Sequence, residues 1–230
     1  MAAYEDPGCA YCPDGVRACR VGEQERRGPG FCPSKVNGTA VRESLDRYQD
    51  DFTRRVIQES TVANLEGYTT YTRVEGICAF AKRMNFTKIG IASCISFLDS
   101  ARTLSEILES HGFKVASACC RNGGIDGEAL GISKVRKTPS GTPETVCNPI
   151  GQAELLNQAG CELNVILGLC VGHDSLFARA SQGLTTTLVV KDRILAHNPI
   201  GALTYADTLY QRVWGPERPQ KPTRKPRVIG

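Results

Sequence analysis

The sequence predicts an α/β fold in which a mostly parallel sheet lies between two layers of helices. Short apolar runs alternate with amphipathic helical patterns from about residue 88 to residue 190. Strands that alternate with helices imply crossover connections, and a parallel sheet must be covered on both faces. With 230 residues, the chain is long enough for one such domain and additional segments.

The expected elements follow one another regularly. Two helices come first, because apolar residues recur at spacings of three and four over 40–64 and 67–84. Four strands then alternate with helices: strands over 88–94, 114–120, 163–170 and 185–190, and helices over 97–111, 149–160, 173–182 and 198–214. This order is typical of a Rossmann-like or flavodoxin-like sheet, where ligands bind outside the carboxyl ends of the strands.

Composition divides the chain into three parts. Residues 1–38 are rich in Cys, Gly and Pro without any regular period, so we expect a small module that folds around metal. Residues 39–214 form the α/β domain, and 215–230 a basic, Pro-rich tail that accounts for the formal net charge of +4. A generally basic nucleic-acid-binding surface is therefore not indicated, and the tail is either extended chain or an arm for nucleic acid or an acidic partner.

The cysteines point to metal or thiolate chemistry. The chain shows no signal peptide and no apolar run that spans a membrane, so we expect a cytoplasmic protein with reduced thiols. Four cysteines near the N-terminus form a Cys-x2-Cys-x6-Cys-x12-Cys pattern that suits zinc or an iron–sulfur cluster: Cys9, Cys12, Cys19 and Cys32. The alternative is four free thiols in an irregular arm.

A second group of cysteines falls at predicted strand ends. Cys94, Cys120 and Cys170 each close a strand, so all three should line one edge of the sheet. Cys147 opens the sequence Cys-Asn-Pro-Ile-Gly, which recurs at His197 as His-Asn-Pro-Ile-Gly. In both copies Asn suits the N-cap of a helix and Pro its first turn, and a helix N-terminus favours a thiolate.

These positions predict a second metal or cluster site, formed by Cys94, Cys120, Cys147 and Cys170. Cys119 is the alternative to Cys120, since adjacent strand residues face opposite ways. Cys78 and Cys161 are expected to be ordinary buried side chains. Arg121 and Lys191 follow strands and place charge at the same edge, unless they are merely solvated strand ends.

Cys170 also has a competing interpretation. Gly168-Leu-Cys-Val-Gly-His173 resembles the nucleophile elbow of class I glutamine amidotransferases. Those enzymes need a downstream His with Glu two positions later, whereas His197 is followed by Asn198 and Pro199. A cysteine-nucleophile hydrolase of amidotransferase type therefore remains an alternative without an orienting carboxylate in the expected place.

Several segments together resemble one known family. They are the N-terminal Cys-x2-Cys, Lys88-Ile-Gly-Ile-Ala-Ser-Cys94, Cys147-Asn-Pro-Ile, Gly168-Leu-Cys-Val-Gly-His-Asp174, Val190-Lys-Asp192 and His197-Asn-Pro. The pattern is similar to a prokaryotic family of unknown function described as predicted metal-binding proteins. The resemblance implies metal binding and names no reaction.

The sequence thus predicts an iron–sulfur protein, with a 4Fe–4S cluster favoured and zinc as the alternative. Electrons from a donor would pass from the N-terminal module to the sheet edge, where a small substrate is reduced or desulfurised. His173, Asp174 and His197 are the expected proton carriers. A zinc protein with a structural or regulatory role is the main alternative.

Overall fold

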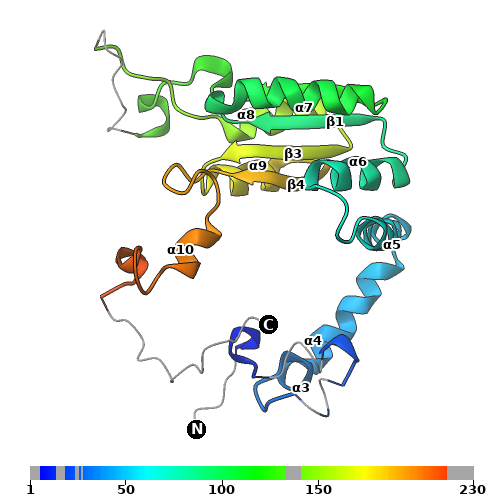
Figure 1. Cartoon of the computed structure of the whole chain (residues 1–230). Coiled ribbons are helices and arrows are strands. Elements are labelled where there is room, and N and C mark those ends of the chain that lie inside the picture. Colours follow the sequence, from blue (N-terminus) through cyan, green and yellow to red (C-terminus); the bar gives the residue numbers. More distant parts are fainter. Residues whose placement is uncertain (1–5, 14–18, 24–25, 27, 133–140, 217–230) are drawn as a thin grey trace. The chain divides into compact units, whose positions relative to one another are not determined.

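The computed structural model describes residues 6–13, 19–23, 26, 28–132 and 141–216 (Figure 1). The chain divides into two compact units, Met1–Tyr71 and Thr72–Gly230. The predicted organisation into 1–38, 39–214 and 215–230 stays a prediction, and most of the basic tail lies outside the described residues.

The second unit holds a four-stranded, all-parallel sheet, which confirms the predicted α/β class. Its strands are β1 (Lys88–Ser93), β2 (Lys114–Cys119), β3 (Leu163–Leu169) and β4 (Leu184–Val190). They lie in the order β2-β1-β3-β4. The strand order reverses between β1 and β3, and ligands of such sheets bind where this reversal occurs.

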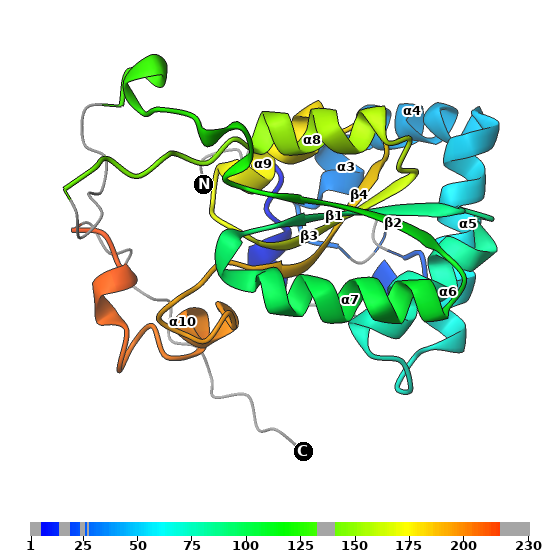
Figure 2. The ribbon, with the colours of Figure 1, turned by 90° about the horizontal axis from the view of Figure 1, so that it is seen from above.

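Helices cover both faces of this sheet (Figure 2). On one face, α7 (Leu98–Ser110) packs on β1 and β2. On the other, α8 (Pro149–Gln158) packs on the same two strands and α9 (His173–Ala180) packs on β3 and on α8. The preceding helix α6 (Arg73–Arg83) joins β4 through Arg73, whose Nη2 donates to Thr186 Oγ1 at 2.6 Å.

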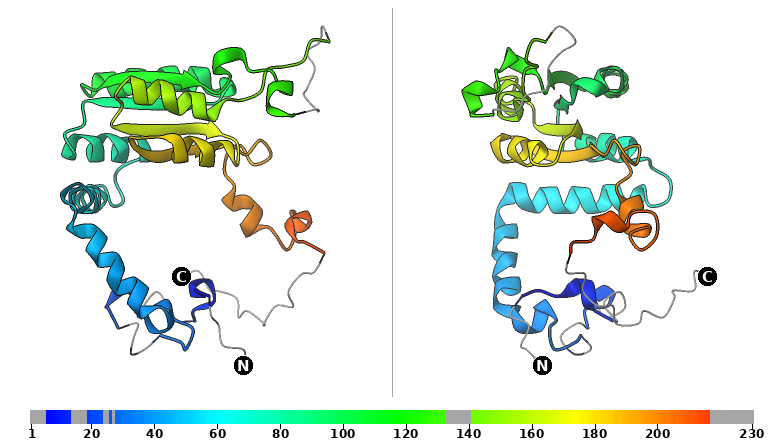
Figure 3. Two further views of the ribbon diagram at one scale, coloured as in Figure 1. Left: turned by 180° about the vertical axis from the view of Figure 1, so that it is seen from behind. Right: turned by 90° about the vertical axis from the view of Figure 1, so that its left-hand side faces the viewer.

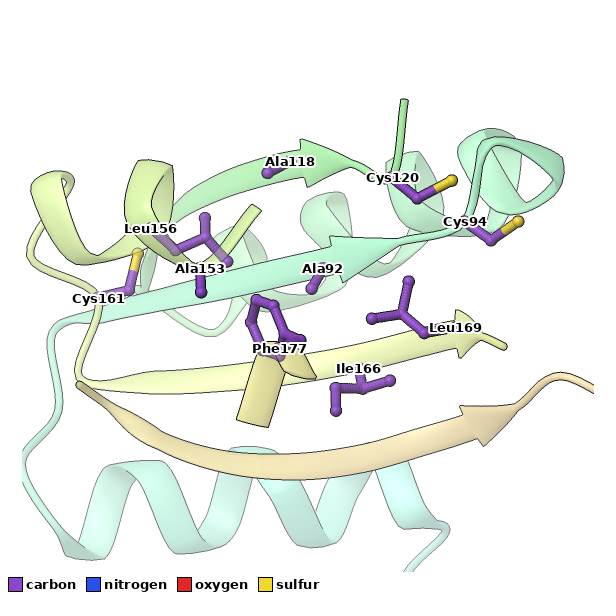
Figure 4. Close-up of a cluster of buried hydrophobic side chains, with 10 residues drawn as sticks. All are labelled: Ala92, Cys94, Ala118, Cys120, Ala153, Leu156, Cys161, Ile166, Leu169 and Phe177. Carbon is purple, nitrogen blue, oxygen red and sulfur yellow. The ribbon is translucent and has the colours of Figure 1, made fainter. Parts of the chain in front are cut away.

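A core of small and apolar side chains lies between the sheet and the pair α8–α9 (Figure 4). Its buried members are Ala92, Cys94, Ala118, Cys120, Ala153, Leu156, Cys161, Ile166, Leu169 and Phe177. Figure 4 shows Cys161 at the amino end of the sheet and the sulfurs of Cys94 and Cys120 at its carboxyl end. The predicted burial of Cys78 and Cys161 is confirmed, with 3% and 6% exposure.

The first unit is built of short helical segments. These are η1 (Cys9–Tyr11), α3 (Pro33–Val36), α4 (Gly38–Glu43), η2 (Ser44–Gln49) and α5 (Asp51–Glu66). The single helix predicted over 40–64 is wrong, because the backbone of Asp50 is extended and its carboxylate accepts from Thr53 N at 2.8 Å to begin α5. Figure 3 shows the chain turning between the blue segment that contains η2 and the cyan helix α5.

Two other predicted helices are shorter than expected. The helix predicted from residue 67 begins only after Thr72, whose side chain forms a capping box with Glu75. The helix predicted over 198–214 is wrong: only α10 (Ile200–Thr204) and the short η6 (Gln211–Val213) form there. Leu203 and Leu209 are each 72% exposed, so a longer helix would gain no burial to stabilise it.

The remaining short turns are η3 (Ile95–Phe97), η4 (Asn122–Gly124) and η5 (Glu128–Leu130).

Among the described residues, no helix combines the length and the apolar character that crossing a membrane demands.

Candidate cysteine site at the carboxyl edge of the sheet

Backbone hydrogen bonds bring three cysteine-bearing segments together where β1 and β2 end. Cys94 N donates to Leu167 O at 3.1 Å, and Cys120 N donates to Ser93 O at 2.9 Å. The segment of Cys147 joins them because Asn148 N donates to Cys120 O at 2.7 Å. Each cysteine is therefore fixed by the sheet or by an extension of it.

The first copy of the repeated pentapeptide works as predicted, and the second does not. Asn148 caps α8, since its Oδ1 accepts from Gly151 N at 2.9 Å, and Pro149 occupies the first turn. No side-chain cap begins α10, where Pro199 takes the N-cap position instead of Asn198. Ala196 and His197 have φ values of 49° and 67°, so the chain turns before this short helix instead of leading into it.

Gln152 ties the ends of β1 and β2 beneath the cysteines. Its side chain is fully buried, and Nε2 donates to Ser93 O at 3.0 Å and to Ala118 O at 2.7 Å. Its Oε1 is buried without a hydrogen-bond partner among the described residues. A buried amide oxygen without a partner lowers the stability of the fold. The two hydrogen bonds donated by Nε2 offset part of this cost and link the ends of β1 and β2.

Cys120 is the most deeply placed of these thiols, at 2% exposure. Burial raises its pKa strongly, and the neighbouring thiols of Cys147 and Cys94 raise that pKa further. The backbone N–H of Ile95 donates to Cys120 Sγ at 3.3 Å and acts in the opposite direction. The three thiols are therefore near neighbours, and Cys120 stays protonated unless a cation accompanies it.

Cys94 lies in a different electrostatic environment. Its Sγ is 3.2 Å from Ser96 Oγ, and Lys191 Nζ lies 2.5 Å from that hydroxyl. Burial alone would raise the pKa of Cys94, but hydrogen bonds from Ser96 and Lys191 and the charge of Lys191 lower it to about 7. Cys94 thus ionises more readily than Cys120.

Arg121 places a second cation beside the other two thiols. Its Nη2 pairs with Glu144 Oε2 at 3.0 Å, and Nη1 donates to the carbonyl of Thr145. Burial opposes the guanidinium charge, but Glu144 and the nearby thiols of Cys147 and Cys120 raise the pKa of Arg121. Its Nε is buried with no hydrogen-bond partner in the described part of the chain.

The three expected proton carriers lie in two places, His197 near Phe97 and the other two at the start of α9. The ring of His197 lies 4.7 Å from that of Phe97, edge to face, and its Nδ1 accepts from Asp192 N at 3.1 Å. Lys191 Nζ lies over the same Phe97 ring at 4.5 Å, so His197 belongs to the surroundings of Cys94. His173 begins α9, and the carboxylate of Asp174 accepts from Ser175 N at 2.8 Å.

Cys170 differs from Cys94 and Cys120 in the hydrogen bonding of its thiol. It follows β3 and is half-buried, and its thiol makes no hydrogen bond within the described ranges. Its carbonyl accepts from the N–H groups of His173 and Asp174 at the start of α9. In the described residues no imidazole forms a hydrogen bond with this thiol, so the amidotransferase-type interpretation gains no partner for the nucleophile.

The N-terminal cysteines are only partly drawn together. Cys12 N donates to Cys9 O at 3.2 Å, which closes a turn around the Cys-x2-Cys pair. A Cβ on Gly8 would lie 3.1 Å from the Phe31 ring, so the residues before Cys9 and Cys32 are neighbours. Cys9 and Cys19 are exposed, whereas Cys32 is buried. Metal binding by these four thiols stays a prediction.

The thiols at the sheet edge are suitable metal ligands by their chemistry, but their side chains are not arranged to bind a metal in this structure. Three thiols, two of them receiving or sharing hydrogen bonds at sulfur, are the ligands that zinc and iron–sulfur clusters use. Within the described ranges, however, no three His, Cys, Asp or Glu side chains are close enough as placed to hold a metal ion. Binding would therefore require the thiols to rotate inward.

Sequence reasoning missed Ser96 and Gln152. Ser96 lies two residues beyond a strand end and beside Cys94, a position that could have marked it as a partner of the thiol. Gln152 is a buried residue of α8, and no local sequence pattern marks it as a bridge between two strands.

The fold and its edge define a class: a parallel α/β protein with a row of thiols beside the switch in strand order. Residues 32–188 match DUF1847, a family of proteins of unknown function, and the chain belongs to that family. An uncharacterized protein of Methanocaldococcus jannaschii is 43% identical over 159 residues, which cover 69% of this chain and 80% of the relative. No solved structure matches the chain. The family of unknown function expected from the sequence motifs is thus confirmed, and metal binding by it stays a prediction.

Proposed function

We propose that this protein binds a metal centre at the carboxyl edge of its sheet, through Cys94, Cys120 and Cys147. The observation that carries the proposal is the buried Cys120 thiol, which has the thiols of Cys94 and Cys147 as neighbours and a backbone N–H directed at its sulfur. A buried thiol cannot ionise alone at moderate cost, and a bound cation removes that cost. Cys170 is the remaining candidate for a fourth ligand.

An iron–sulfur cluster is the centre that we favour. Hydrogen bonds to cluster and cysteine sulfurs set cluster potentials, and Ile95 N and Ser96 Oγ supply such contacts. Arg121 and Lys191 contribute positive charge beside the thiols, which suits an anionic cluster better than a neutral structural site. When bound, the cluster would supply electrons for redox or sulfur chemistry on a small substrate.

The chain's own residues would position the substrate and move protons. Lys191 supplies positive charge near Cys94, and Arg121 supplies it near Cys147 and Cys120. His197 lies beside Phe97 with a ring nitrogen not used by Asp192. Imidazole is suited to proton transfer near neutral pH. Substrate reduction or desulfurisation at this edge is consistent with these roles.

The experiment is metal analysis of the full-length protein purified without oxygen. We expect iron with acid-labile sulfide and the broad visible absorption of an iron–sulfur chromophore. A colourless protein that contains stoichiometric zinc would replace the cluster with the zinc alternative. Protein free of both metals, and unable to take up either, would contradict metal binding altogether.

A further inference from the structure

The region around Lys191 carries more chemistry than a metal ligand set requires. Lys191 is half-buried at the end of β4, and its ammonium contacts the Ser96 hydroxyl and the face of the Phe97 ring. In the described part of the chain no carboxylate pairs with it. The nearest acidic side chain in sequence, Asp192, instead accepts from Ile194 N and Leu195 N, both at 3.0 Å.

An ammonium group has three donors, and here Ser96 and the Cys94 sulfur are its hydrogen-bond partners. A partly buried cation without a carboxylate partner attracts an anion more strongly than a solvated one does, because water screens it less. The neighbouring carboxylate is occupied by backbone N–H groups, so an anion at Lys191 must come from outside these elements.

The distances place the Cys94 sulfur close to any anion that Lys191 holds. Cys94 Sγ and Lys191 Nζ both contact the same oxygen, Ser96 Oγ, at 3.2 and 2.5 Å. The carbon atoms next to a carboxylate held by Lys191 are therefore within reach of the Cys94 sulfur.

We propose that Lys191 anchors the carboxylate of a small substrate so that the carbon next to it lies against Cys94. The substrate class is a short-chain carboxylic acid whose reacting group is one or two bonds from the carboxylate. This inference concerns the sheet-edge site of the proposed function, but it does not depend on which metal the site binds.

The test compares two alkylating reagents of similar size, of which only one carries a negative charge that Lys191 can attract. Iodoacetate carries a carboxylate beside its reactive carbon, and iodoacetamide is neutral. In both reactions the Cys94 sulfur forms a bond to carbon and iodide leaves. The ratio of their rate constants cancels the fraction of thiolate, and glutathione in the same solution supplies the reference ratio.

The experiment uses the full-length protein, as purified and after anaerobic treatment with a chelator, with Cys94 followed by peptide mass spectrometry. We expect the iodoacetate preference of Cys94 to exceed that of glutathione by about fivefold at low salt, the effect of one charge pair at contact distance in water. The preference should fall as salt is added.

Variants isolate the contribution of Lys191. Lys191→Met should reduce the ratio to that of glutathione, and Lys191→Arg should keep most of it. Arg193→Met removes an exposed cation two residues away and should leave the ratio unchanged. Circular dichroism checks that each variant is folded.

The proposal is overturned if wild-type Cys94 shows the glutathione ratio, if it fails to react with iodoacetate in both preparations, or if Lys191→Met keeps the preference. The metal content of the same preparations is measured separately. A normal metal content with no carboxylate preference would reject this inference and leave the metal site standing. A carboxylate preference in protein that binds no metal would support this inference and reject the metal site.

Discussion

At the scale of single residues, the sheet edge holds two thiols whose surroundings shift their pKa values in opposite directions. Cys120 is surrounded by other thiols and an apolar core, so its pKa is raised. Cys94, one strand away, has the hydroxyl of Ser96 and the ammonium of Lys191 beside it, so its pKa falls to about 7. Neighbouring thiols whose pKa values are shifted in opposite directions are frequent at functional sites, and this contrast supports the proposed site.

Gln152 is the residue that holds these thiols in place. Gln152→Leu keeps the side-chain volume but removes the donor that bridges Ser93 O and Ala118 O. We expect the free energy of unfolding to fall by about 1–3 kcal/mol, the usual cost of unpaired buried polar groups. Gln158→Leu, at an exposed position of the same helix, is the control and should change stability little. Equal stability of the two variants in urea denaturation would show that the bridge is unimportant.

At the scale of elements, the Phe97 ring packs directly against a glycine near the end of β3. Gly168 has a φ of 73°, and a Cβ there would lie 2.3 Å from the Phe97 ring. Gly160 has a similar φ of 70°, but a Cβ there would meet no atom within 4 Å. The two glycines therefore share the backbone requirement and differ in the space available to a side chain.

Gly168→Ala should be more destabilising than Gly160→Ala. Both variants pay the cost of a left-handed backbone, of order 1–2 kcal/mol. Only Gly168→Ala also displaces Phe97, which adds about 1–3 kcal/mol of overpacking and disturbs the surroundings of Lys191. Thermal unfolding of the two variants measures the difference. A Gly160→Ala variant that is equally or more destabilised would contradict this assignment of the Phe97 contact.

The start of β1 depends on an ionised carboxylate. Glu162 Oε2 accepts from Thr87 N at 2.7 Å and from Lys88 N at 3.1 Å. Partial burial would raise the pKa of Glu162, but these bonds and the Thr87 hydroxyl lower it below its ordinary value. Because the folded-state pKa is the lower one, the stabilisation is complete above the unfolded-state pKa. It is lost as the pH falls through the folded-state value.

Glu162→Gln should therefore lower stability at pH 7, with the difference from wild type disappearing toward strongly acidic pH. Chemical denaturation across the pH range measures this difference. Glu154→Gln, at an exposed position on α8, should give a nearly constant small difference. A Glu162→Gln difference that does not change with pH would mean that the charge of the carboxylate is irrelevant.

At the scale of the whole molecule, the alternation of strand and helix patterns predicted the α/β class and the edge where Cys94 and Cys120 lie. These features follow from local periodicity and from a general rule of parallel sheets. The break before α5 was not predictable from apolar spacing, because it depends on Asp50, whose backbone is extended and whose side chain caps α5. The helix over 198–214 failed for a different reason, since spacing does not reveal whether an apolar face finds a partner.

Within the site, the limit of prediction was distance along the chain. Cys94 and Ser96 are neighbours in sequence, but Lys191 comes from 95 residues beyond Ser96 and Gln152 from 59 beyond Ser93. No local pattern indicates such pairs. The sequence grouped Cys170 with the other thiols because it closes a strand, and its place among the ligands stays a prediction.

The central claim is that the thiols at the sheet edge bind a metal centre, and its most direct test is metal content per chain in two matched variants. Cys120→Ser removes the buried thiol that neighbours Cys94 and Cys147, and Cys161→Ser removes another buried thiol at the opposite end of the sheet. Both are purified without oxygen and checked for folding. We predict that Cys120→Ser loses the metal of this site and that Cys161→Ser retains it. Equal metal content in the two variants would contradict the account.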